Sequence, residues 1–176
     1  LVGSEMCIET EEFYADFRHG IIAFHDPARY GRSPLENSSF LVSSAHPDES
    51  LHGAGFVARL TGATAEFLSM WALMMAGPQP FFLQEGELCL HLRPALPGWL
   101  FDQTGDLRFT FLGQCQVIYH NPRRLDTFDS SLRIDALVLH SEGDRVEISG
   151  DFIPAPYASR VREGRVERIQ VAFSAA

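Results

Sequence analysis

Hydrophobic positions are spaced differently in the two halves of the chain. In the first half, the segment from Gly62 to Ala76 reads GATAEFLSMWALMMA and predicts a helix with almost no polar side. A helix that is apolar nearly all round is normally buried in a larger body. A further helix is predicted from about Thr10 to Phe24, and the stretch from His25 to about Leu60, which is rich in Ser, Pro, Gly, Asn and His, is predicted to be irregular.

In the second half, hydrophobic residues recur at every other position, which is the pattern of strands that bury one face. Turn-forming Gly, Pro, Asn and Asp residues separate these segments. Several short strands at such spacing predict an antiparallel β-sandwich or jelly roll. The predicted strands are Glu87 to Leu92, Leu107 to Phe111, Cys115 to Tyr119, Leu132 to Leu139, Val146 to Ile148 and Val166 to Phe173.

The two patterns meet at residues 77–80, which read GPQP, and a Gly with two Pro in four residues ends a helix. We therefore expect a helical segment over residues 1–77 and a β-sandwich domain over residues 78–176. The predicted fold class is α+β, with a few N-terminal helices followed by an antiparallel β-sandwich or jelly roll.

Composition narrows the classes of function. The formal net charge of −9 disfavours a nucleic-acid partner, because affinity for phosphate backbones is carried largely by Lys and Arg. No segment approaches the ~20 consecutive apolar residues that span a membrane, so we expect no membrane partner. Cys7, Cys89 and Cys115 contain no Cys-x-x-Cys pair, which disfavours a disulfide framework or a cysteine zinc site and favours a reducing, cytoplasmic location.

A candidate anion site lies where the irregular stretch meets the apolar helix. Thr61 is a natural N-cap, Gly62 lets a ligand approach the backbone, and Arg59 adds a positive charge nearby. The free amide groups and the dipole of a helix N-terminus favour a bound phosphate. The alternative is an ordinary capped helix with a solvated arginine.

Two more residues are candidates for binding substrate. Glu66, in the first turn of the helix, needs a polar partner, which is either a sugar hydroxyl or a structural group such as Arg59 or a backbone donor. His52 is a structural or a substrate-contacting histidine, because no His-x-x-x-His spacing or zinc-ligand pattern is present. We therefore predict no metal and no cofactor. No catalytic residue is assigned, since the chain has no Gly-x-Ser-x-Gly elbow and no recognisable catalytic cysteine.

The order and spacing of several segments resemble the C-terminal region of inverting glycoside phosphorylases of the cellobiose, cellodextrin and oligoglucan phosphorylase type. In that family a Gly-containing segment is followed eight residues later by Thr-Gly, then by a helix and by a strand that ends in a Pro-x-Leu-Pro turn with tryptophan. The counterparts in this chain are Gly53, Thr61-Gly62, the helix to Ala76, Leu90 to Trp99, and Leu107 to Asn121-Pro122.

The resemblance implies an (α/α)6 barrel that carries the active site and is closed at the C-terminus by a jelly roll, so the helices of this chain would be the remnant of that barrel. It implies phosphorolysis of β-glucosides, with inorganic phosphate as substrate and with Thr61 and Gly62 contributing to phosphate binding. The general acid would lie in an upstream catalytic part, which makes this chain inactive alone. Further implied partners are an oligosaccharide or β-glucan and a second copy in a homo-oligomer.

The chain departs from the family pattern after Thr61-Gly62, where Ala63, Thr64, Ala65 and Glu66 replace the usual Ser or Thr, small residues and Trp. A related glycoside hydrolase is therefore also considered. The alternative from a different class is a non-catalytic carbohydrate-binding or structural β-sandwich module, favoured by the β-rich second half and the lack of a catalytic carboxylate pair.

Overall fold

The computed structural model describes residues 10–19, 42–54, 62–141 and 143–175, with side chains of the helix that starts at residue 62 described from Leu68 onward. The chain divides into two compact units, Leu1–Met70 and Trp71–Ala176. Each unit is described by itself below. None of the helices in the described residues has the length and hydrophobicity needed to cross a membrane.

In the first unit, residues 10–19 form a helix, as predicted for this segment, and residues 20–24 of that prediction lie outside the described part. Tyr14 and Phe17 are buried, and Phe13 contacts both rings. Residues 42–54 form turns around a short 3-10 helix, η1 (Glu49–Leu51), within the stretch predicted to be irregular.

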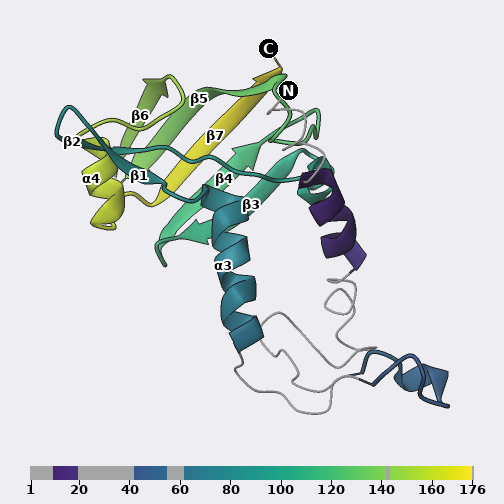
Figure 1. Cartoon of the computed structure of the whole chain (residues 1–176). Coiled ribbons are helices and arrows are strands. Elements are labelled where there is room, and N and C mark those ends of the chain that lie inside the picture. The colour runs from purple at the N-terminus through teal and green to yellow at the C-terminus, as the bar shows by residue number, and fades with distance from the viewer. Residues whose placement is uncertain (1–9, 20–41, 55–61, 142, 176) are drawn as a thin grey trace. The chain divides into compact units, whose positions relative to one another are not determined.

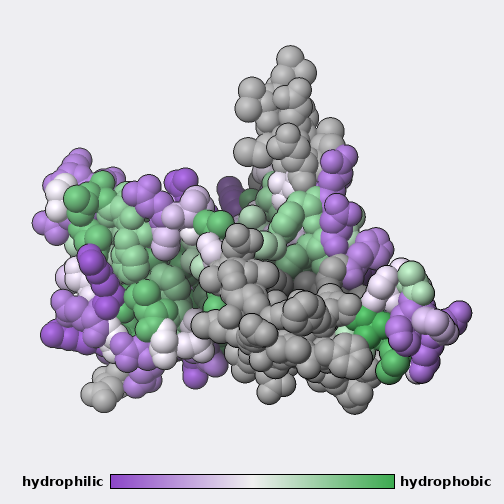
Figure 2. All heavy atoms as spheres, turned by 60° about the horizontal axis from the view of Figure 1, so that its bottom comes forward, coloured by the Kyte–Doolittle hydropathy of each residue, from purple (hydrophilic) through white to green (hydrophobic). Residues whose placement is uncertain are grey.

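The apolar helix is α3 (Gly62–Ala76), and both predicted ends are confirmed. It ends at Gly77, whose φ of +84° suits glycine and whose N–H donates to Leu73 O. Only part of the expected burial is found. Met74 is buried, whereas Leu68 and Leu73 are 56% and 47% exposed. Hydrophobic residues, green in Figure 2, also reach the surface on the face drawn there.

The second unit contains a hairpin, a five-stranded sheet and a short helix (Figure 1). The hairpin pairs β1 (Phe81–Gln84) with β2 (Glu87–Leu90). The sheet has the order β3-β4-β7-β5-β6. Its strands are β3 (Asp106–Phe111), β4 (Cys115–His120), β5 (Leu132–Ser141), β6 (Asp144–Ser149) and β7 (Arg168–Ala175), and the helices are η2 (Gly98–Leu100) and α4 (Tyr157–Arg162).

These elements confirm an α+β class with a β-rich second part. Each of the six predicted strands overlaps one of β2 to β7, while β1 and α4 were not predicted. The expected purely antiparallel pairing is wrong at one place, because β4 and β7 run parallel. Parallel neighbours need a long crossover, and here β5, β6 and α4 form it.

The core lies against one face of the five-stranded sheet. Val117, Tyr119 and Ile169 on this face are fully buried. The Tyr119 hydroxyl donates to Met75 O at 2.5 Å, which ties the end of α3 to the sheet, and burial raises the pKa of this phenol. Phe81 of the hairpin stacks on Phe111 of β3 with ring centroids 6.1 Å apart. The hairpin and the end of α3 therefore cover this face.

An extended segment after β2 is fixed by side chains of the loop that follows β4. Asp126 accepts from Gly98 N at 2.6 Å, and the Thr127 hydroxyl donates to Pro94 O and accepts from Leu96 N. The Asn121 side chain is only 1% exposed, and its amide donates to Leu125 O and accepts from Leu125 N within the same loop. These bonds satisfy buried polar groups, as a two-layer core requires.

Candidate functional site

Most residues of the predicted phosphate site lie outside the described part of the chain. This holds for Arg59 and Thr61, while Gly62 is the first residue of α3. The backbone of Glu66 lies in the first turns of α3, and its side chain is not among those described. The predicted anion site and the contacts of Glu66 therefore stay predictions.

His52 is described, and its ring bonds to the backbone. Its Nε2 donates to His46 O at 2.7 Å, and the His46 Nδ1 accepts from Asp48 N at 3.1 Å. Asp48 caps η1 by accepting from Ser50, and these hydrogen bonds hold the pKa of Asp48 below its ordinary value. Both histidines thus fix the turn around η1, and a sugar contact of His52 stays a prediction.

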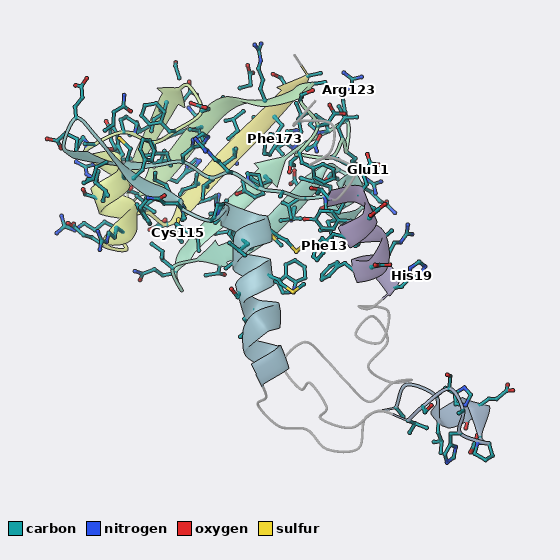
Figure 3. The ribbon with its side chains drawn as sticks, in the orientation of Figure 1. Glu11, Phe13, His19, Cys115, Arg123 and Phe173 are labelled. Atoms are coloured by element: carbon teal, nitrogen blue, oxygen red, sulfur yellow. The ribbon has the colours of Figure 1, made fainter. Side chains whose placement is uncertain are left out.

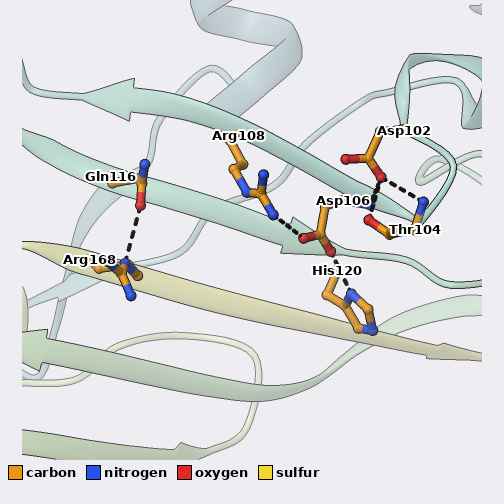
Figure 4. Close-up of polar contacts among 7 residues, drawn as sticks. All are labelled: Asp102, Thr104, Asp106, Arg108, Gln116, His120 and Arg168. Carbon is orange, nitrogen blue, oxygen red and sulfur yellow. Dashed lines mark hydrogen bonds and ion pairs between the residues drawn. The ribbon is translucent and has the colours of Figure 1, made fainter.

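The richest polar arrangement in the described residues is the open face of the five-stranded sheet, opposite the core (Figure 4). Asp106 is the first residue of the edge strand β3, and its side chain is only 15% exposed. Its Oδ2 accepts from Arg108 at 2.6 Å, and its Oδ1 is 2.7 Å from His120 Nδ1 on the neighbouring strand. Because a carboxylate oxygen only accepts, His120 Nδ1 carries the proton.

The turn before β3 positions Asp106. Asp102 Oδ1 accepts from Thr104 N, from the Thr104 hydroxyl and from Asp106 N, at 2.8, 2.6 and 2.9 Å. These bonds, led by that from the Thr104 hydroxyl, lower the pKa of Asp102. Gly105 has a φ of +80°, and a Cβ there would lie 2.5 Å from Asn121 O. These contacts hold the start of β3 in place, and with it the Asp106 carboxylate.

Two further pairs continue the polar face across the sheet. His140 Nε2 donates to Gln170 Oε1 at 2.8 Å, and Arg168 Nε donates to Gln116 Oε1 at 3.2 Å. Four strands thus contribute linked polar side chains to this face.

The open face is hollowed, with a cavity volume of about 470 Å³. Its polar lining includes Asp106, Arg108, His120 and Gln170. Its apolar lining is formed by Ile118, Ala136, Val138, Val171 and Ala172. This combination of a small apolar floor and several hydrogen-bonding groups is typical of a ligand site.

A smaller hollow of about 290 Å³ lies beside the end of α3 and includes Phe82, His91 and Arg93. Arg93 Nε donates to His91 Nδ1 at 3.0 Å, and His91 Nε2 lies 3.5 Å from Asp151 Oδ2. Burial lowers the pKa of His91 and outweighs the opposing effect of Asp151. His91 is therefore uncharged at neutral pH, with its Nδ1 hydrogen-bonded to Arg93 and its Nε2 close to Asp151.

The described cysteines are buried and do not offer a nucleophile. Burial raises the pKa of the Cys115 thiol to about 11, which keeps it protonated. Cys115 at the start of β4 and Phe173 near the end of β7 lie toward opposite ends of these parallel strands (Figure 3). Within the described ranges, no group of three or more His, Cys, Asp or Glu is arranged to hold a metal ion.

Sequence reasoning missed the open-face cluster of Asp106, Arg108, His120 and Gln170. The signal was present in the alternation of β3 and β4, since DLRFTF places a polar residue at every second position and CQVIYH places Gln116 and His120 on one side of its strand. Alternation does not predict the order of the strands, and it is this order that brings Gln170 of β7 next to β4.

Comparison with known proteins adds no identification. No family model matches the chain, and no curated protein matches it significantly.

Proposed function

We propose that this chain is the C-terminal part of a carbohydrate-active enzyme of the inverting glycoside phosphorylase type, or of a related glycoside hydrolase, and that it is inactive alone. In this proposal α3 and the helix over residues 10–19 are the remnant of an (α/α)6 barrel. The β-rich unit is the closing jelly roll. Inorganic phosphate is the second substrate, and a homo-oligomer in the cytoplasm is the working form.

The observation that carries this proposal is α3 itself. The helix begins at Gly62, directly after the proposed phosphate residues Arg59 and Thr61. Its residues Leu68 and Leu73 remain about half exposed. An apolar helix surface of this kind suits contact with further protein, here the upstream catalytic part.

Chemically, phosphate would attack the anomeric carbon while an upstream carboxylic acid protonates the leaving oxygen. The role of this chain would be to hold the phosphate at the start of α3, through Thr61, Gly62 and Arg59, with Glu66 and His52 toward the sugar. These residues bind and orient substrate and transfer no proton.

The test is phosphate-dependent release of sugar 1-phosphate from β-glucans by the chain together with its upstream catalytic part. Thr61→Val should raise the KM for phosphate about tenfold, because one hydrogen bond to a charged group is lost. Thr110→Val, on the exposed side of β3, is the matched control and should leave this KM unchanged. An unchanged phosphate KM in Thr61→Val would refute the site, and activity without phosphate would refute phosphorolysis.

The second candidate is a non-catalytic carbohydrate-binding module. The hollow on the open sheet face, with its linked polar side chains, favours this candidate. Titration of the chain with β-glucan oligosaccharides tests it. Failure to bind would leave a structural role for the β-rich unit.

A further inference from the structure

We infer that the hollow on the open face of the five-stranded sheet binds an uncharged pyranose oligosaccharide through Arg108, His120 and Gln170. This rests on the carbohydrate-related function proposed above and does not require phosphorolysis. The site lies entirely within the second unit, on β3, β4, β5 and β7 and the turn before β3.

Hydrogen-bonding groups of both kinds line the hollow. His120 Nδ1 donates to Asp106, and Nε2 of the same ring accepts a hydrogen bond whenever it carries no proton of its own. Gln170 Oε1 accepts from His140, and within the described residues no acceptor takes the two amide protons of Gln170. A sugar hydroxyl donates one hydrogen bond and accepts others, so it can bridge an acceptor such as His120 and a donor such as Gln170.

The charges in the hollow favour an uncharged ligand. Its lining holds one acidic residue, Asp106, and one arginine, Arg108, and these form an ion pair at 2.6 Å. A phosphate would meet the Asp106 carboxylate, and a cation would meet the Arg108 guanidinium.

The floor of the hollow suits the apolar face of a sugar ring. Ile118 and Val138 supply aliphatic surface, while Ala136 and Ala172 keep the floor low enough for close approach. The volume of about 470 Å³ lies within the range of small-ligand sites. Since the described lining contains no Phe, Tyr or Trp ring for a sugar to stack on, we expect weak binding, with a Kd of about 1 mM.

The experiment titrates the whole chain with a neutral β-glucan tetrasaccharide and follows binding by NMR or calorimetry. Ala136→Phe fills the hollow and should weaken binding at least about tenfold. Gln170→Leu removes the donor without filling the hollow and should weaken it about threefold to tenfold. Glu147→Gln, an exposed change on the same face but outside the hollow, should bind like the unmodified chain.

Each other outcome overturns the inference. If both hollow variants bind the tetrasaccharide as well as Glu147→Gln does, carbohydrate binding stands but its site lies elsewhere. If the folded, unmodified chain binds no tetrasaccharide up to about 20 mM, this face is not a sugar site. If glucose 1-phosphate binds more tightly than the neutral sugar and Ala136→Phe weakens that binding, the ligand class of the hollow is wrong. The phosphate assay of the enzyme with Thr61→Val is independent of all three results.

Discussion

The two faces of the five-stranded sheet are made by alternate residues of the same strands, yet they differ in what lies over them. Ile169 is fully buried beneath the covered face, whereas Ile118 on the neighbouring strand belongs to the open face and is half-buried. On the open face the polar residues are bonded to one another rather than to a covering layer. Stability is therefore concentrated on one face, which leaves the other free for binding.

The largest effect is expected at Gly98, where the extended segment after β2 approaches the loop after β4. A Cβ at Gly98 would lie 1.8 Å from Arg124 O, so Gly98→Ala forces the backbone to move. We expect a loss of roughly 4 kcal/mol or more in the free energy of unfolding, measured by urea denaturation.

Gly86→Ala is the control for that substitution. Gly86 needs its φ of +86°, but a Cβ there would meet nothing within 4 Å. Strain alone should then cost about 1 kcal/mol. If Gly86→Ala and Gly98→Ala lower the free energy of unfolding equally, Gly98 does not pack against the loop after β4 as closely as the structure shows.

Matched isoleucines on the two faces give the next largest effect. Ile169→Ala opens a cavity under the covered face and should lower the free energy of unfolding by about 2–5 kcal/mol. Ile118→Ala, on the adjacent strand but the open face, should cost about 1 kcal/mol or less. Urea denaturation of the two variants measures the difference, and similar losses would contradict the contrast between the faces.

The sequence was sufficient for elements whose pattern is local. The ends of α3 and the six predicted strands follow from hydrophobic spacing and from Gly and Pro punctuation. β1 was missed because Phe81-Phe82-Leu83 is a short apolar run without alternation, and α4 because it has only six residues. Pairing of β4 with β7 joins residues about fifty positions apart, which no local pattern specifies.

The same limit applies to the candidate site. Alternation places Asp106 and Arg108 on one side of β3, but His120 and Gln170 join them only through strand order. The phosphate residues Arg59 and Thr61 were read from helix-cap chemistry, which is local, and they lie outside the described residues.

The smallest effect is a change in the pH dependence of stability, and it comes from His91, directly after β2. Burial holds the pKa of His91 below its ordinary 6.5, so the unfolded chain binds this proton more readily than the folded chain does. The stability linked to His91 is complete above about pH 6.5 and is lost as the pH falls toward its folded pKa. His91→Asn should flatten this part of the stability profile.

Asp151→Asn should change the profile in the opposite direction. The Asp151 carboxylate favours the charged imidazole, so its removal lowers the pKa of His91 further and extends the loss of stability to lower pH. The effect should be small, because the Asp151 side chain is 59% exposed and its charge is screened. Thermal unfolding between about pH 5 and 8 measures both variants. A profile that stays unchanged in His91→Asn would mean that His91 is not desolvated beside Phe82 and the end of α3.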